Sequence, residues 1–191
     1  MYAYKGYEKY KKEKLATLKP KLAGIENGQS PKTLFITCSD SRICPNELTS
    51  SEQGELFVIR NAGNTIPHFD KSNGNADAAT LEYAVKALGV EEIIVCGHTH
   101  CGAIGALMTG VDANQLGTIA SYLSELNELR ELSLERKMTG IETIKENIKF
   151  QLENIHSYDF VQQAMSQGKL KTYGWIYGLE TGEVELVDCE A

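Results

Sequence analysis

The sequence has no hydrophobic run of the ~18–20 residues that a membrane-spanning helix needs. Residues 1–7 also lack the apolar stretch that is typical of a secretory signal. No internal repeat and no low-complexity segment is present among the 191 residues. We therefore expect a soluble protein without a signal peptide or a membrane partner, long enough to form one domain with a substantial core.

The chain also lacks an excess of positive charge. With 19 Lys and Arg against 26 Asp and Glu, its net charge is −7, which argues against nucleic acid as the main partner. The charge is unevenly distributed, because residues 1–21 carry seven Lys and two Glu. This basic segment could dock onto a neighbouring acidic subunit, or it could be a solvated helix face, and the sequence favours neither alternative.

Cysteine is scarce and odd in number. There are five cysteines, and two of them stand among residues that typically bind metals. This pattern disfavours a disulfide framework and favours a reducing compartment, so we expect a cytoplasmic protein.

Apolar strands alternate with helical patterns along the chain. Short apolar runs at residues 33–37, 55–60 and 92–97 predict buried strands, and residues 173–177 and 183–187 predict a hairpin. Helical periodicity is found at residues 77–88, 115–132 and 141–165, and also at 5–28, where Pro20 either breaks the helix or starts a second one. We expect one α/β domain over residues 1–191. Its mostly parallel central sheet is flanked by helices, with a helical N-terminal arm (residues 1–30) and a C-terminal hairpin.

Metal-type ligands follow two of the predicted strands. Cys38 comes directly after residues 33–37, and His98 and Cys101 come after residues 92–97. Two thiolates and one imidazole make three ligands for a tetrahedral zinc and leave one position open, as in catalytic rather than structural zinc sites. The sequence thus indicates a zinc that activates water at the carboxyl ends of the strands.

The run Cys38-Ser-Asp40-Ser-Arg42 places a carboxylate and a guanidinium next to the first ligand. If residues 38–42 are extended, these three side chains point to one face. Arg42 can then hold Asp40 ionised through a bidentate pair, and Asp40 can orient a zinc-bound water. A purely structural ion pair is the alternative.

Several segments together resemble one family, the β-class carbonic anhydrases. They are residues 38–42, 54–64, 81–85 and 96–102, with weaker support from residues 173–177 and 181–184. The resemblance implies one zinc held by Cys38, His98 and Cys101, with Asp40 and Arg42 as the catalytic pair. It further implies reversible hydration of carbon dioxide to bicarbonate and a proton. The implied assembly is a homodimer or a tetramer made of dimers, in which the N-terminal helices cover the partner subunit.

Two departures from the family pattern stand out. Some members have a tryptophan three residues before the first ligand as part of a bicarbonate site outside the catalytic centre, and this chain has Phe35 there. Between the ligands it has Thr99 and His100, a variant that we do not expect to change the chemistry. In some members the aspartate can also replace water on zinc, which stays a hypothesis for Asp40.

Other residues near the predicted site carry weaker expectations. Gly102 could offer its N–H to a substrate oxygen, and His100 either moves protons or simply faces outward. We expect Cys44 to point away and Arg60 to serve a turn or an interface. Two rival functions remain open at this point: hydrolysis of carbon disulfide or carbonyl sulfide, and a zinc-stabilised assembly subunit without catalysis.

Overall fold

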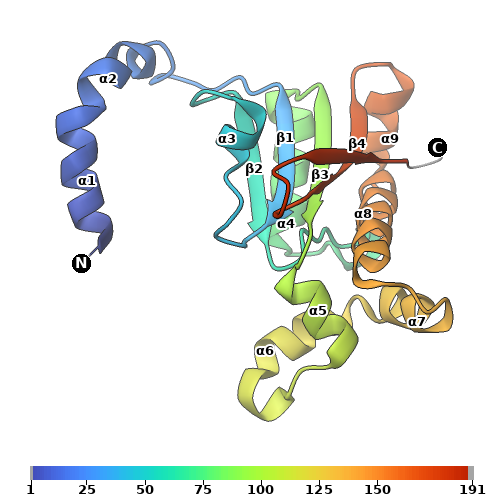
Figure 1. Cartoon of the computed structure of the whole chain (residues 1–191). Coiled ribbons are helices and arrows are strands. Elements are labelled where there is room, and N and C mark those ends of the chain that lie inside the picture. The colour runs from blue at the N-terminus through green and yellow to red at the C-terminus, as the bar shows by residue number, and fades with distance from the viewer. Residues whose placement is uncertain (1, 189–191) are drawn as a thin grey trace.

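The computed structural model describes residues 2–188 and is built on a five-stranded sheet (Figure 1). The strand order is β2-β1-β3-β4-β5. The first four strands are parallel, and β5 pairs antiparallel with β4. The strands are β1 Thr33–Cys38, β2 Leu56–Asn61, β3 Glu92–His98, β4 Lys171–Tyr177 and β5 Val184–Val187. The predicted α/β architecture and its C-terminal hairpin are thus confirmed.

Helices surround this sheet and extend beyond it. The α-helices are α1 Tyr2–Glu13, α2 Leu15–Ala23, α3 Pro45–Thr49, α4 Ala76–Glu82, α5 Gly102–Thr109, α6 Ala113–Ser124, α7 Asn127–Glu135, α8 Gly140–His156 and α9 Asp159–Ser166. A 3₁₀ turn covers Phe69–Lys71, and α4 continues as a π-helical turn over Tyr83–Leu88. No described helix is long and apolar enough to cross a membrane.

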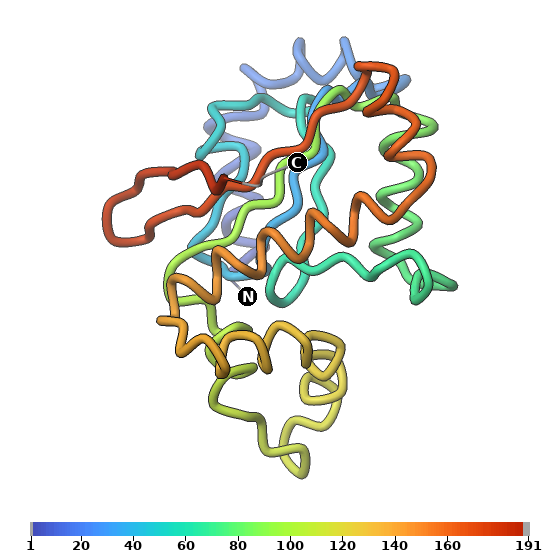
Figure 2. The backbone as a smooth tube through the Cα atoms, turned by 90° about the vertical axis from the view of Figure 1, so that its right-hand side faces the viewer, coloured from blue at the N-terminus to red at the C-terminus, as the bar shows by residue number. Residues whose placement is uncertain are grey.

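The core lies where α8 packs on the sheet. All six residues of β1 are buried, as expected for a parallel strand covered on both faces. The long helix α8 contacts β3 and β4 (Figure 2) and buries Ile144, Ile148 and Ile155 in the same cluster as Ile93 and Val95. Helices α5, α6 and α7 extend past the carboxyl end of β3 (Figure 1).

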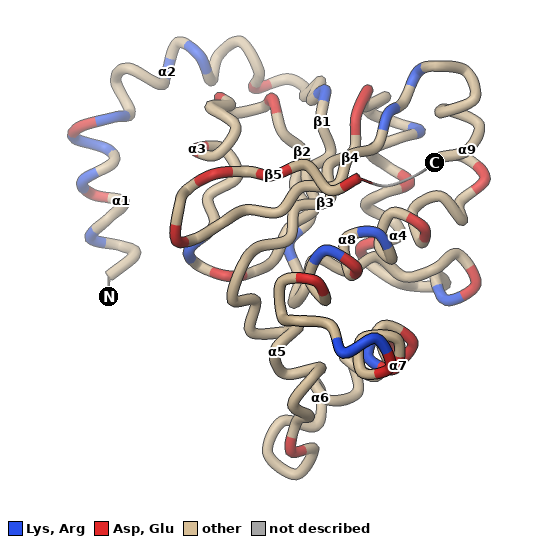
Figure 3. Tube along the Cα trace, turned by 45° about the vertical axis from the view of Figure 1, so that its right-hand side comes forward, with Lys and Arg blue, Asp and Glu red and all other residues tan. Residues whose placement is uncertain are grey.

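Helix α1 projects away from this body, and α2 is tied to it by an ion pair between Lys21 and Glu52. No described residue of α1 or α2 is buried, and Figure 3 shows Lys positions, with Glu between them, along the arm. The break occurs at Lys14, whereas Pro20 lies inside α2, so the prediction that Pro20 ends or begins a helix is wrong. Because α2 is exposed, the carbonyl group that Pro20 leaves without an N–H donor can bond to water instead.

Two predicted helices are each divided. The segment 115–132 breaks between α6 and α7, and 141–165 breaks at Tyr158, whose backbone is extended. Tyr158 is 2% exposed, and its hydroxyl donates to the carbonyl oxygen of Pro67 (2.8 Å). The apolar periodicity continues across the break because both helices bury a face in one core, which hides the boundary from the sequence.

Candidate metal centre

Three potential ligands meet at the carboxyl edge of the sheet. Cys38 ends β1, His98 ends β3, and Cys101 immediately precedes α5. Their ligand atoms all lie within 4.8 Å of one another, and the two sulfurs are 3.9 Å apart. Adjacent parallel strands end at the same edge, which is why residues 60 positions apart in the sequence converge.

His98 is oriented as a metal ligand would be. Its side chain is fully buried, and Nδ1 lies 2.8 Å from the carbonyl oxygen of Thr99. An N–H at Nδ1 satisfies that carbonyl and leaves a lone pair on Nε2, which has no partner among the described residues. A buried, unpaired nitrogen within 4.8 Å of two sulfurs fits a zinc ion.

The two thiols are hydrogen-bonded to each other, and this bond shifts their pKa values in opposite directions. A hydrogen bond from Cys101 is the main reason that the pKa of Cys38 falls to about 4, with further help from His98. The same hydrogen bond and burial raise the pKa of Cys101. These opposite shifts favour a thiolate at Cys38 and a thiol at Cys101, from which a bound divalent cation would draw the proton.

Asp40 and Arg42 form the predicted pair, but not on an extended segment. Residues 40–43 make a turn closed by a bond from Ile43 N to Asp40 O (3.1 Å), so the expectation of an extended run is wrong. Arg42 donates from Nε (2.9 Å) and Nη2 (2.7 Å) to the two Asp40 oxygens, and from its backbone N–H (3.0 Å). These bonds hold the pKa of Asp40 well below its usual range.

The Asp40 carboxylate faces the ligand cluster. Its Oδ2 lies 3.8 Å from Nε2 of His98, and the Asp40 side chain is 16% exposed. The carboxylate therefore offers a fixed, ionised acceptor to a water molecule beside the ligand cluster.

Arg60 has a larger role than the sequence suggested. Its guanidinium donates to the carbonyl oxygens of Cys38 (3.2 and 3.1 Å) and Asp40 (2.8 Å). We expected only a turn or an interface residue. Arg60 lies on β2, opposite Thr37 of β1. From there it also fixes the backbone of Cys38 and Asp40. Only the strand register, which a single sequence does not reveal, could have identified it.

The loop between His98 and Cys101 is tied to the C-terminal hairpin. Glu180 accepts hydrogen bonds from Thr99 Oγ1 (2.7 Å) and from the ring of His100. His100 is exposed, has a left-handed backbone (φ 53°), and accepts from Arg42 Nη2 at its carbonyl (3.2 Å). His100 therefore faces outward, one of the two alternatives considered, and its backbone supports Arg42.

The other residues that the sequence singled out lie outside the ligand cluster. Cys44 is exposed and outside the ligand cluster, Cys96 is buried in the core, and Cys189 lies outside the described residues. Gly102 is the first residue of α5, and a methyl group built on it would meet no described atom within 4 Å. Phe35 packs edge-on against Trp175, with ring centroids 6.0 Å apart.

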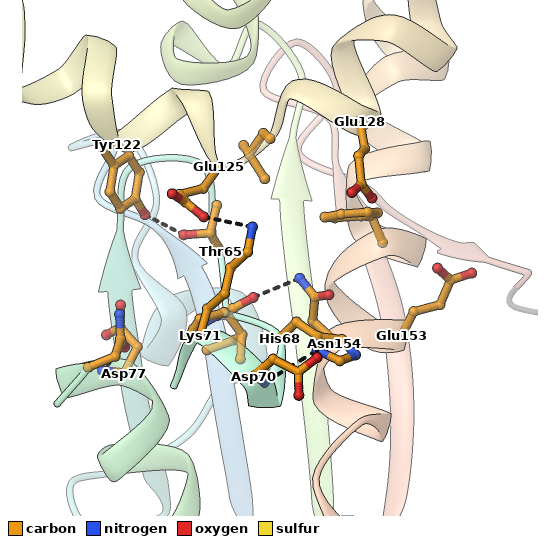
Figure 4. A pocket seen from close by; sticks show the side chains of 15 residues that line it. Thr65, His68, Asp70, Lys71, Asp77, Tyr122, Glu125, Glu128, Glu153 and Asn154 are labelled. Atoms are coloured by element: carbon orange, nitrogen blue, oxygen red, sulfur yellow. Dashed lines mark hydrogen bonds and ion pairs between the residues drawn. The ribbon is translucent and has the colours of Figure 1, made fainter. Parts of the chain in front are cut away.

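A cavity of about 820 Å³ opens beside the loop that follows β2 (Figure 4). None of the three potential ligands lines it. Its wall combines residues of the loop after β2 with residues of α6 and α8, among them Thr65, Tyr122 and Asn154. The catalytic candidates therefore lie at the sheet edge, apart from this hollow.

Comparison with known proteins agrees with this geometry. Residues 33–184 match the family model for carbonic anhydrase. A carbonic anhydrase of Synechococcus elongatus is 46% identical over 165 residues, which are 82% of this chain and 60% of that relative. The structure of the β-carbonic anhydrase CcaA has a TM-score of 0.91 at 37% identity and covers 97% of this chain and 93% of that one.

A second structure bears on assembly. It is one of two tetrameric β-carbonic anhydrases from Sordaria macrospora, with a TM-score of 0.79 at 27% identity, covering 98% of this chain and 92% of that one. The chain belongs to the carbonic anhydrase family and is, by its fold, a β-class enzyme, a lyase that interconverts carbon dioxide and bicarbonate.

Proposed function

We propose that Cys38, His98 and Cys101 hold one zinc ion in each subunit. The observation that carries this proposal is the buried Nε2 of His98, which lacks a partner among the described residues and lies within 4.8 Å of both sulfurs. Burying a polar nitrogen without a bond is costly, so an ion at this position explains the arrangement. Four protein ligands would close the site, and the exposed Cys44 is not among the clustered atoms.

We assign Asp40 and Arg42 to the reaction. When held by Cys38, His98 and Cys101, zinc would act as a Lewis acid and lower the pKa of water from ~15.7 toward ~7. Asp40 accepts a hydrogen bond from the attacking water and so directs a lone pair of its oxygen at carbon dioxide. Arg42 keeps this carboxylate ionised and fixed in direction through two parallel hydrogen bonds.

Gly102 would bind the substrate. It begins α5, so its N–H is one of the groups without a partner inside the helix. No described atom outside its own helix and chain neighbours lies within 4 Å of a methyl group built on Gly102, so other parts of the chain do not crowd this residue.

The assembly would be a homodimer or a dimer of dimers in the cytoplasm, with residues 1–191 as one domain. Support comes from the basic helices α1 and α2, which bury no residue against their own subunit although Lys21 pairs with Glu52 (Figure 1). The net charge of +5 over residues 1–21 complements the acidic remainder.

The ligand assignment is tested by Cys101→Ser with Cys44→Ser as the matched control. Zinc content and the rate of carbon dioxide hydration should both fall strongly in Cys101→Ser, because a serine hydroxyl is a poor replacement for a thiolate ligand. Cys44→Ser should retain both. Full zinc occupancy in the Cys101 variant, or loss in the Cys44 variant, would contradict the assignment.

A further inference from the structure

The turn between β4 and β5 carries a carboxylate that reaches the loop between two of the proposed ligands. Glu180 accepts a hydrogen bond from Thr99 Oγ1 (2.7 Å) and is paired with the ring Nε2 of His100. The N–H of Leu179 donates to the same Thr99 hydroxyl (2.9 Å). Because β3 and β4 are parallel neighbours, the chain leaves both strands at one edge of the sheet, which brings these distant segments together.

These contacts hold the backbone of His100 in an unfavourable conformation. His100 has a left-handed φ of 53°, which a residue with a side chain adopts only where its surroundings hold it there. The ring of His100 is bonded to Glu180, and the preceding Thr99 is bonded to both Glu180 and Leu179. The side chains of His100 and Glu180 are exposed, so this ion pair contributes little stability on its own. Its main consequence is the direction in which the His100 carbonyl points.

The His100 carbonyl points at Arg42. It accepts a hydrogen bond from Nη2 (3.2 Å), and the same nitrogen donates to Asp40 Oδ2 (2.7 Å). A guanidinium is planar, so fixing both hydrogens of Nη2 fixes the plane of the whole group. The Arg42 side chain is 52% exposed, and packing therefore holds it only weakly. The His100 carbonyl is thus a second acceptor, besides Asp40, that orients this guanidinium.

We propose that Glu180 is a positioning residue, which acts through the backbone of His100 to keep Arg42 aligned on Asp40. This inference rests on the proposed role of the Asp40–Arg42 pair in the reaction. The Glu180 side chain is bonded to Thr99 and His100, one step removed from that pair. Without this carboxylate the loop loses two bonds, and Arg42 is free to turn away from Asp40 while the three proposed ligands stay in place.

The first measurement follows Arg42 itself by NMR, without any reaction. An Nη2 that is held by two acceptors rotates slowly about its bond to Cζ, so its two hydrogens should give separate signals in the wild-type protein. Glu180→Ala should merge or broaden these signals. Glu183→Ala is the matched control, because Glu183 is exposed on the same turn and its side chain makes none of the bonds described above. It should leave the signals separate. Arg42→Lys, which lacks the guanidinium, assigns them.

Zinc content and the rate of carbon dioxide hydration are measured in the same variants. Glu180→Ala should keep its zinc and lose about 10–100-fold in rate, the usual range for groups that support a metal site from outside. Glu180→Gln, which keeps one acceptor oxygen, should recover part of this loss. In an Arg42→Ala background Glu180→Ala should cost little more, because its effect passes through Arg42.

Merged signals in the wild-type protein, unchanged signals in Glu180→Ala, or a full additional loss in the Arg42→Ala background would overturn the role of Glu180. Loss of zinc from Glu180→Ala would also overturn it, since Glu180 would then support the ligands rather than Arg42. If Arg42→Ala alone hydrates carbon dioxide at the wild-type rate, the proposed function of the Asp40–Arg42 pair fails instead. If Glu180→Ala does not fold, Glu180→Gln replaces it in every comparison and should show a smaller change of the same kind.

Discussion

Each polar atom of the metal centre has its role set by the partner that it has or lacks. His98 uses Nδ1 for a backbone carbonyl and leaves Nε2 unpaired within the described structure. Asp40 has both oxygens engaged by Arg42, so it stays ionised across the neutral range. The imidazole is thereby left for a metal and the carboxylate for a water molecule.

The role of Asp40 predicts a separation of metal binding from turnover. Asp40→Ala should retain zinc, because the carboxylate is not one of the three clustered ligands. Its hydration rate should fall by about 10²–10⁴-fold, the usual range for losing a group that handles protons. Stopped-flow hydration with metal analysis measures both, and Ser41→Ala on the same exposed turn is the control. Undiminished turnover would remove Asp40 from the mechanism.

His156 predicts a pH dependence of stability outside the metal centre. Its half-buried ring lies 2.9 Å from the Thr172 hydroxyl, and desolvation lowers its pKa. Neutral His156 therefore stabilises the fold above the unfolded pKa of about 6.5, and this stabilisation is lost as the pH falls through the lower folded value.

Urea unfolding at pH 7.5 and pH 5.5 measures this effect. His156→Asn should lose less free energy of unfolding between the two pH values than the wild-type protein does, because it has no ring to protonate. His68→Asn, which changes an exposed histidine, is the control. An unchanged difference in the His156 variant would show that this ring does not contribute.

The sequence predicted which three potential ligands meet, but it did not predict all of the contacts around them. Cys38, His98 and Cys101 were identifiable because each follows an apolar strand, and strand ends of a parallel sheet meet. The Asp40–Arg42 pair was also predicted, although it forms on a turn rather than an extended run. The contacts of Arg60 were not recognised, because its partners are the backbone carbonyls of Cys38 and Asp40, at and just after the end of a neighbouring strand whose register a single sequence does not specify.

At the scale of elements, α8 packs directly on β3, the strand that ends at His98. Gly97, next to His98, makes this contact close, since a methyl group there would lie 2.9 Å from Cδ1 and 3.1 Å from Cγ1 of Ile148. It would also lie 3.2 Å from Ile144. Glycine is required here by the approach of the helix rather than by its backbone angles.

Gly97→Ala should therefore destabilise the protein by about 1–3 kcal/mol, the usual effect of overpacking a core. Adding Ile148→Val removes the Cδ1 atom nearest to the new methyl group and should recover part of the loss. Chemical denaturation of the single and double variants gives the coupling between the two sites. Strictly additive losses would show that the helix–strand contact is not the cause.

Element boundaries were less predictable than element types. The strands and the hairpin were located to within about two residues, whereas the breaks at Lys14 and Tyr158 were missed. At Tyr158 the chain leaves the helix so that a buried phenol can reach Pro67, a long-range contact with no local signal. Tertiary contacts, rather than local propensity, set these boundaries.

For the molecule as a whole, the exposed basic arm is the feature that most requires a partner. Helices α1 and α2 leave the body in Figure 1, and Tyr2, Tyr4 and Tyr7 are each more than half exposed. An isolated short helix of this kind is marginal in water, so packing against another subunit would stabilise it.

Deleting residues 1–24 should weaken the proposed assembly while preserving the fold of the body. Sedimentation velocity should show a shift toward monomer, and zinc content should remain near one per subunit. A substitution of Lys9 and Lys11 by Ala in the full chain separates loss of charge from loss of the helix. An unchanged oligomer after the deletion would show that the arm is not part of the subunit contact.

The most direct test of the account is zinc-edge X-ray absorption of the purified wild-type protein. We predict two sulfur ligands at ~2.3 Å, one histidine nitrogen at ~2.0 Å and one light-atom ligand supplied by solvent. A first shell with fewer than two sulfurs, or one filled by a third sulfur or a second histidine, would contradict the open site on which the proposed chemistry depends.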